Sequence, residues 1–135
     1  MAQYMGSAYN DTITMAAGTD DFAFGFSGND VIQDDFGLPS NDSMYGGDGA
    51  DTLITRGGVD VMYGENGRDT FQFFTGFYNI TIDGGNGNDT LKVDRNLFAP
   101  GEADALDELA DSGALFALAN GGVAYIKDIE VIWLS

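Results

Sequence analysis

The sequence contains no cysteine and no histidine among its 135 residues. The missing cysteine excludes a disulfide framework, a zinc–thiolate site and a cysteine nucleophile. The missing histidine removes the commonest general base and the commonest ligand of transition metals. The chain also has no G-x-S-x-G nucleophile elbow and no phosphate-binding P-loop. We therefore expect a protein that is not an enzyme.

Basic residues are scarce, with 5 Lys and Arg against 22 Asp and Glu and a net charge of −17. Such a surface repels nucleic acid and anionic membranes. An acidic excess of this size is typical of disordered chains, of halophilic surfaces or of cation-binding proteins. Ten Phe, six Tyr and a hydrophobic content of 44% argue against disorder, because they are enough to build a core. The composition favours cation binding.

Long apolar runs are also missing, so the sequence predicts no membrane span. The start, MAQYMGSAYND, has neither a charged n-region nor an apolar run, and we expect no cleaved amino-terminal signal. The length fits a single domain, residues 1–135.

Glycine, by contrast, is abundant, and it recurs in turns that end in aspartate. The strongest copies are GFSGNDVI (25–32), GGDGADTLI (46–54), GENGRDTFQ (64–72) and GGNGNDTLK (84–92), after a weaker first copy, GSAYNDTIT (6–14). Fainter copies between them close on Asp21, Asp42 and Asp60, and an eighth, in residues 74–82, has no aspartate. The unit is therefore about nine residues, and two units make a coil of about eighteen.

Each unit predicts a turn followed by a short strand whose apolar residue, two after the aspartate, points inward. These inward positions are Ile13, Ala23, Ile32, Met44, Leu53, Met62, Phe71 and Leu91. A three-residue strand cannot bury its apolar side chain alone, so neighbouring coils must stack. The sequence predicts an all-β parallel β-roll, a two-stranded β-solenoid of about five coils over residues 4–93.

GGDGADTLI and GGNGNDTLK match the pattern G-G-x-G-x-D-x-U-x at every defined position, while Phe26 and Glu65 replace the second glycine in two other copies. This part of the chain resembles the RTX (hemolysin-type) calcium-binding β-roll family. The resemblance implies Ca²⁺ ions between stacked turns, held by the closing aspartates and by turn carbonyls. Ca²⁺ takes six to eight oxygen ligands, which such turns supply.

The copies differ between the two edges of the predicted roll. The first turn position is glycine in all five copies of one edge (Gly6, Gly25, Gly46, Gly64, Gly84) but not on the opposite edge. We predict one row of up to four calcium ions along the glycine-rich edge. The expected ligands are the aspartates Asp11, Asp30, Asp51, Asp69 and Asp89 and the turn residues Gly25, Ser27, Gly46, Asp48, Gly64, Asn66, Gly84 and Asn86.

Other acidic residues have a second interpretation. Asp21, Asp42 and Asp60 are as well explained by structural turns or caps as by metal ligation. Asp20, Asp34 and Asp35 are expected to face solvent, and residues 34–36 belong to a three-residue insertion that should form a loop.

Residues 94–135 no longer follow the repeat and predict a small α+β cap. We expect an amphipathic helix in 99–113, a hairpin around Asn120-Gly121 in 114–126, and a final strand in 129–134. Five apolar residues of this segment are predicted to lie in the core: Leu106, Leu109, Leu115, Phe116 and Trp133.

The leading hypothesis is a secreted calcium-binding protein that folds outside the cell and has a structural or assembly role. Because the first turn begins at Gly6, we expect the first coil either to stack on another copy or on a domain missing from this chain, or to form a frayed polar end. The resemblance implies a bacterial protein exported by type I secretion. Two alternatives are a non-catalytic module that supports secretion, folding or polysaccharide binding of an exported enzyme, and a sugar or surface binder that uses Phe36, Phe74, Phe77 and Tyr78.

Overall fold

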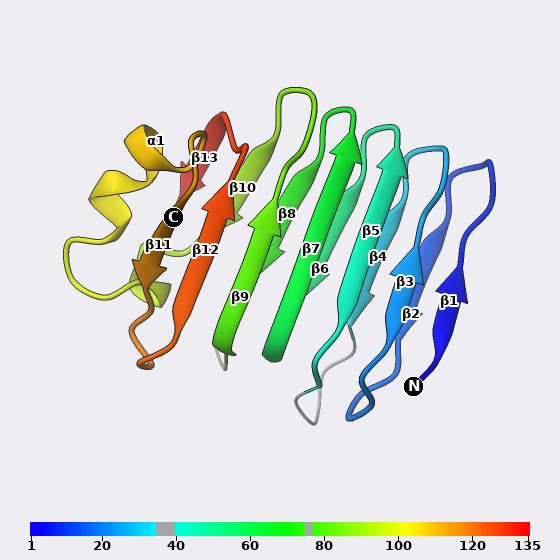
Figure 1. Cartoon of the computed structure of the whole chain (residues 1–135), viewed down its shortest axis with the longest axis horizontal. Helices are drawn as coiled ribbons and strands as arrows, with labels where there is room; N and C mark the ends of the chain where they lie inside the picture. The colour runs from blue at the N-terminus through cyan, green and yellow to red at the C-terminus, as the bar shows by residue number, and fades with distance from the viewer. Residues whose placement is uncertain (35–39, 75–76) are drawn as a thin grey trace.

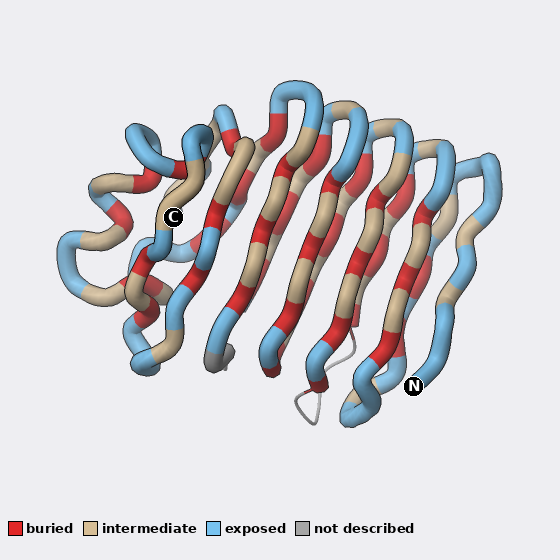
Figure 2. Tube along the Cα trace, in the orientation of Figure 1, coloured by how far each residue is buried: buried red, intermediate tan, exposed pale blue. Residues whose placement is uncertain are grey.

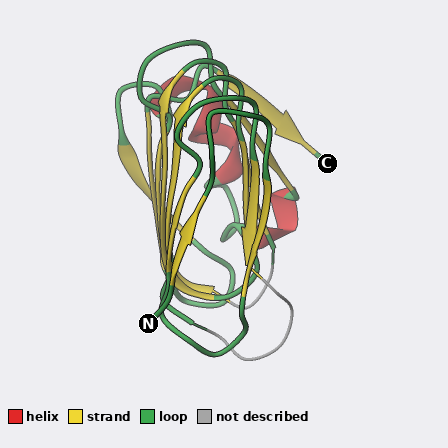
Figure 3. Ribbon diagram, turned by 90° about the vertical axis from the view of Figure 1, so that its right-hand side faces the viewer, coloured by secondary structure: helices red, strands yellow, loops and turns green. Residues whose placement is uncertain are grey.

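The computed structural model describes residues 1–34, 40–74 and 77–135. Two sheets face each other as layers (Figure 3). Sheet A has the strand order β1-β3-β5-β7-β9-β12-β11, and sheet B has the order β13-β10-β8-β6-β4-β2. The first strands of sheet A are β1 (Gln3–Met5), β3 (Phe22–Phe24), β5 (Ser43–Asp48), β7 (Gly58–Asn66) and β9 (Phe77–Asp83). Those of sheet B are β2 (Thr12–Met15), β4 (Val31–Asp34), β6 (Thr52–Thr55), β8 (Thr70–Phe73) and β10 (Thr90–Val93).

The chain alternates between the two sheets, so each coil contributes one strand to each sheet (Figure 1). All pairs among these ten strands are parallel and join equivalent positions of neighbouring coils, as Met44 with Met62 and Leu53 with Phe71. The predicted parallel β-roll is therefore confirmed.

The space between the sheets is filled by one apolar column. Burial alternates along the strands, as Figure 2 shows by its red and tan bands. In the eighth unit, Ile80 pairs with Asp60 and so occupies the position of the missing aspartate, and Ile82 pairs with Met62 and points inward. The eight predicted inward residues are all buried: Ile13, Ala23, Ile32, Met44, Leu53, Met62, Phe71 and Leu91. The sequence pattern identified these positions because the residue two after each aspartate lies on the inward face of its strand, as does the residue two further on in β2 and β8, Met15 and Phe73.

The fourth turn position requires glycine for two physical reasons. Gly49 and Gly67 have φ angles of 121°, in the left-handed region that side chains rarely adopt. A Cβ atom on Gly49 would also overlap the carbonyl oxygen of Gly28 in the preceding coil, and one on Gly67 would overlap that of Gly49. Glycine here lets the turns of adjacent coils stack in contact.

The segment after the repeats is more than a cap. It contains η1 (Arg95–Leu97), η2 (Ala103–Ala105), α1 (Leu106–Leu109), β11 (Ala114–Ala117), β12 (Val123–Lys127) and β13 (Val131–Leu134). The predicted hairpin is confirmed, since β11 and β12 pair antiparallel around residues 118–122. However, β12 also pairs in parallel with β9, and β13 with β10. These two strands form a sixth coil, which the sequence did not predict.

Parts of the predicted cap were wrong. The helix is a single turn preceded by a 3₁₀ segment, so it presents one buried leucine, Leu106, and leaves Leu109 41% exposed. Phe116 is buried as predicted, whereas Leu115 on the edge strand β11 is exposed. Trp133 is 62% exposed because it alternates with inward residues along β13, and Lys92 Nζ lies 5.2 Å from the centre of its ring.

We expect Gly49→Ala to destabilise the protein by about 3 kcal/mol or more, because strain at positive φ adds to the overlap with Gly28. Gly121→Ala is the matched control, since Gly121 has φ 96° with nothing within 4 Å of its added Cβ, and it should cost only about 1–2 kcal/mol. Denaturant unfolding in saturating calcium measures both. Equal losses would contradict the role given to turn stacking.

Candidate metal centre

The turns of one edge are joined by a ladder of carboxylate–backbone hydrogen bonds. We call the edge formed by the turns that close on Asp11, Asp30, Asp51, Asp69 and Asp89 the glycine edge. There, the backbone N–H of each closing aspartate donates to Oδ1 of the closing aspartate one coil later. The four donor–acceptor distances are 2.8 Å for Asp11 to Asp30, 2.8 Å for Asp30 to Asp51, 2.9 Å for Asp51 to Asp69 and 2.8 Å for Asp69 to Asp89.

The second carboxylate oxygens of this ladder have no donor. In the part of the chain that the structure describes, Oδ2 has no hydrogen-bond partner in Asp30, Asp51, Asp69 and Asp89. All four side chains are buried, with at most 1% of their surface exposed. A buried carboxylate oxygen without a partner carries a large desolvation cost, so each of these four positions calls for a cation or a proton.

Each unpaired oxygen lies beside a carbonyl oxygen of the next coil. A Cβ atom on Gly25 would stand 2.5 Å from Asp30 Oδ2 and 2.5 Å from the carbonyl oxygen of Gly46. At Gly46 the corresponding distances are 2.7 Å to Asp51 Oδ2 and 2.9 Å to the carbonyl oxygen of Gly64. The first turn position is therefore glycine because any side chain would fill the space between two converging oxygens.

On the opposite edge the same ladder bonds run from Asp21 to Asp42 and from Asp42 to Asp60, but there Oδ2 of each closing aspartate has a hydroxyl donor. We call it the hydroxyl edge, because Oδ2 of Asp21 accepts from the Thr19 hydroxyl at 2.7 Å and Oδ2 of Asp42 from the Ser40 hydroxyl at 2.9 Å. Oδ2 of Asp60, the third closing aspartate of this edge, accepts from the Thr55 hydroxyl. These three carboxylates act as structural caps, which is one of the two interpretations that the sequence left open.

Asp11 follows the pattern of the hydroxyl edge although it belongs to the glycine edge. Its Oδ2 accepts from the Ser7 backbone N–H at 2.6 Å and from the Ser7 hydroxyl at 2.9 Å. Ser7 stands where the complete repeats have their second glycine. The first turn therefore already supplies donors for the oxygen that stays unpaired in the later turns.

The prediction for Asp34 was wrong, because this residue is buried at 3% exposure. It alternates with Ile32 along β4 and so points inward. Its Oδ2 accepts from the Arg56 backbone N–H at 2.9 Å and lies 3.1 Å from the Thr55 hydroxyl oxygen, which it shares with Asp60, and its Oδ1 has no partner among the described residues. Asp20 is exposed as predicted. Asp35 and Phe36, and with them the predicted insertion loop, lie outside the described residues.

The third turn positions stack side by side along the glycine edge. Asn66 Nδ2 donates to Asp48 Oδ1 and Asn86 Nδ2 donates to Asn66 Oδ1, each at 2.9 Å. The Gly49 N–H donates to the carbonyl oxygen of Asn66, and Ser27 pairs with Asp48. The side chains of Asp48, Asn66 and Asn86 thus link neighbouring coils, and whether these third turn positions contribute to a metal site stays a prediction.

Electrostatics on the glycine edge oppose full ionisation. Burial raises the pKa of Asp51 to about 7, of Asp69 to about 8 and of Asp89 to about 7, and neighbouring carboxylates add to the increase. Burial likewise raises the pKa of Asp30. Adjacent members of the row therefore disfavour one another's charged form.

The donors on this edge fit a hard cation. Every available atom is a carboxylate or carbonyl oxygen, the ligand type of Ca²⁺ and Mg²⁺. Over the described residues, no three acidic side chains converge closely enough to hold a metal ion by themselves. Main-chain carbonyls must complete any site, and the space at Gly25 and Gly46 shows carboxylate and carbonyl oxygens converging in that way.

A parallel β-roll with stacked glycine turns and a row of unpaired carboxylate oxygens defines a β-solenoid repeat protein whose donors suit a cation. Residues 36–71 and 81–94 match the RTX calcium-binding nonapeptide repeat, in four copies. These two stretches of the chain therefore carry the RTX calcium-binding repeat. Comparison with curated proteins and with solved structures gave no match. Within the described ranges, no helix is long and apolar enough to cross a membrane.

Without calcium, we expect the stability of the roll to fall as pH rises from about 5 to 8. The folded-state pKa values of Asp51, Asp69 and Asp89 lie above the ordinary value of 3.8, so folding takes up protons. That stabilisation is complete at low pH and is lost as these groups ionise. Denaturant midpoints in EDTA at several pH values measure it. A midpoint that is highest at pH 8 would contradict the proposed burial of these groups.

Proposed function

We propose that this chain is a calcium-binding β-roll that folds when it meets calcium outside the cell and has a structural or assembly role. The observation that carries the proposal is the difference between the two edges. On the glycine edge, four buried carboxylate oxygens have no partner among the described residues, whereas serine and threonine hydroxyls satisfy the equivalent oxygens of the hydroxyl edge.

In this proposal, each ion lies between the turns of successive coils. Asp30 with the carbonyl of Gly46, Asp51 with that of Gly64, and Asp69 with that of Gly84 would hold the ions of the repeat region. An ion at Asp11 would have to displace the two Ser7 donors, so we place the start of the row at Asp30. Calcium supplies the positive charge that a row of buried carboxylates needs.

Extracellular folding follows from mass action. An ion that binds only the folded roll stabilises it in proportion to the logarithm of its concentration. The carboxylate row disfavours the folded state without a cation, so low cytosolic calcium would keep the chain unfolded and the higher calcium outside the cell would fold it. The acidic composition and the family of the repeats support bacterial export by type I secretion.

Self-association is a further part of the proposal. Strands β1 and β2 end their sheets at one end of the roll, while β11 and α1 lie at the other end (Figure 1). Edge strands present unpaired backbone groups to which another chain can add. We expect light scattering to show larger particles in millimolar calcium than in EDTA. A strict monomer in both conditions would contradict the assembly role.

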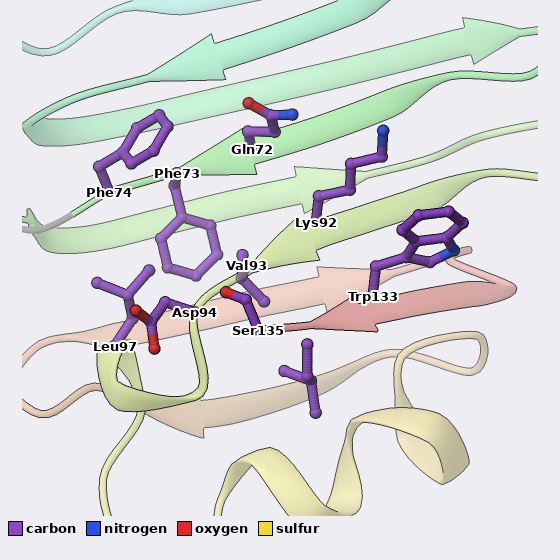
Figure 4. A pocket seen from close by; sticks show the side chains of 10 residues that line it. Gln72, Phe73, Phe74, Lys92, Val93, Asp94, Leu97, Trp133 and Ser135 are labelled. Atoms are coloured by element: carbon purple, nitrogen blue, oxygen red, sulfur yellow. The ribbon is translucent and has the colours of Figure 1, made fainter.

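A second candidate function is polysaccharide binding as a non-catalytic module of an exported enzyme. A hollow of about 510 Å³ on the outside of sheet B brings exposed Trp133 and Phe74 together with the polar side chains of Gln72, Lys92 and Asp94 (Figure 4). Aromatic faces beside hydrogen-bonding groups suit sugar rings. The side chains of Phe77 and Tyr78, also predicted for this role, lie outside the described residues. A glycan array without signal in calcium would exclude this candidate.

We expect Asp51→Asn to raise the calcium concentration needed for folding about tenfold or more, because it removes a charged ligand from the glycine edge. Asp42→Asn is the matched control, since Asp42 makes the same ladder bond on the hydroxyl edge and its Oδ2 already accepts from Ser40. Circular dichroism during a calcium titration measures both midpoints. Equal midpoints would contradict the one-edged arrangement, and a wild-type signal that is already complete in EDTA would contradict calcium-dependent folding.

A further inference from the structure

We propose that the row of calcium sites ends outside the repeats, at a site closed by the sixth coil through the Asp128 carbonyl and the Glu130 carboxylate. This inference rests on the proposed calcium-binding function. It adds two residues that lie beyond the matched repeats, which end at residue 94.

The register of the strands places Glu130 where a closing aspartate belongs. β13 pairs in parallel with β10, and Thr90 lies opposite Val131, so Asp89 and Glu130 precede paired positions. The Asp89 backbone N–H donates to Glu130 Oε2 at 2.6 Å. Glu130 thus makes the bond that Asp30, Asp51, Asp69 and Asp89 make in the earlier turns, across 41 residues of sequence.

The carbonyl oxygen of Asp128 completes the same arrangement as in the repeats. A Cβ atom on Gly84 would stand 2.6 Å from Asp89 Oδ2 and would overlap the Asp128 oxygen. At Gly25 and Gly46 the same two kinds of oxygen lie near the added Cβ, an aspartate Oδ2 and a main-chain carbonyl, and there the carbonyl belongs to a glycine instead of Asp128. Asp128 adopts φ 54°, a left-handed conformation that aspartate tolerates better than most residues.

The Asp89 carboxylate, which faces the Asp128 turn, has an oxygen without a hydrogen-bond partner in the described part of the chain, and this oxygen indicates a ligand. Asp89 is fully buried, and its Oδ2 has no hydrogen-bond partner among the described residues. Glu130, Asp128 and Asp83 are its acidic neighbours. A lysine ammonium, that of Lys127, lies 3.9 Å from the Asp128 carboxylate. A divalent cation beside Asp89 would supply the charge that this group of carboxylates lacks.

The turn is held in place before any ion binds. The Asp128 N–H donates to the Asp111 carbonyl at 3.0 Å, and the Ile129 N–H donates to the Ala110 carbonyl at 3.1 Å. Ile129 is buried beneath the turn. The segment that follows α1 therefore fixes the direction of the Asp128 carbonyl.

The consequence is a link between calcium and the carboxyl-terminal segment. Residues 94–122 leave the roll after β10 and return at β12, so an ion between Asp89 and Glu130 would close this long loop. Cross-links that close long loops remove more chain entropy than those within a repeat. The row would still number four ions, held at Asp30, Asp51, Asp69 and Asp89. The repeats alone suggest a row that begins at Asp11 and ends at Asp69, so the whole row is shifted by one coil.

The test is Glu130→Gln, whose amide oxygen can still accept from the Asp89 N–H while the charge is lost. Glu108→Gln, at an exposed carboxylate on α1, is the matched control. Equilibrium dialysis with calcium alone should give four ions for the wild type and for the control. For Glu130→Gln we expect three tight ions, with the fourth weakened on the order of tenfold to a hundredfold. Trp133, the single tryptophan, lies three residues after Glu130 and reports the same loss by fluorescence.

The outcomes separate this inference from the proposed function. A wild type that binds no calcium would overturn both. Wild-type binding with an unchanged count and unchanged midpoints in Glu130→Gln would overturn the sixth-coil site alone. If Glu130→Gln does not fold, crystals of the wild type grown with gadolinium in place of calcium decide the question by anomalous scattering. A peak beside Asp89 and Glu130 supports the site, and peaks beside Asp51 and Asp69 with none beside Asp89 overturn it.

Discussion

The hydrogen bond from one closing aspartate's backbone N–H to the next aspartate's carboxylate is the interaction on which the roll depends. It fixes the spacing of the coils and turns every closing side chain in the same direction, as from Asp51 to Asp69 at 2.9 Å. Because it uses only Oδ1, it leaves Oδ2 aimed at the interior of the turn. What meets that second oxygen then decides the role of each edge.

On the hydroxyl edge a neighbouring serine or threonine meets the second oxygen, and the turn is complete without a ligand. On the glycine edge the first turn position has no side chain, and a carbonyl from the next coil faces the same space. The Oδ2 atoms of Asp30, Asp51, Asp69 and Asp89 have no donor among the described residues, so this edge calls for protons or a cation. In our proposal, one scaffold therefore carries a structural edge and a metal-binding edge, and small residues in the turns distinguish the two.

Most of the roll could be predicted from the sequence, because in a repeat protein the short pattern of each unit also determines which residues of neighbouring coils pair. The residue two after each aspartate predicted the core from Ile13 to Leu91, and the glycines predicted which edge differs. The sixth coil could not be found in this way, since its turn is three residues shorter and lacks glycine. The only local signal was an apolar residue, Ile132, two positions after Glu130. Asp34 and Trp133 were misplaced because residue type suggested the wrong side of a strand.

The most direct test of this account is a crystal structure of the chain grown in calcium, with the ions located by anomalous scattering. The account predicts one row of ions beside Oδ2 of Asp30, Asp51, Asp69 and Asp89, and none beside Asp21, Asp42 or Asp60. Equally occupied rows on both edges, or a glycine edge without ions in millimolar calcium, would contradict it.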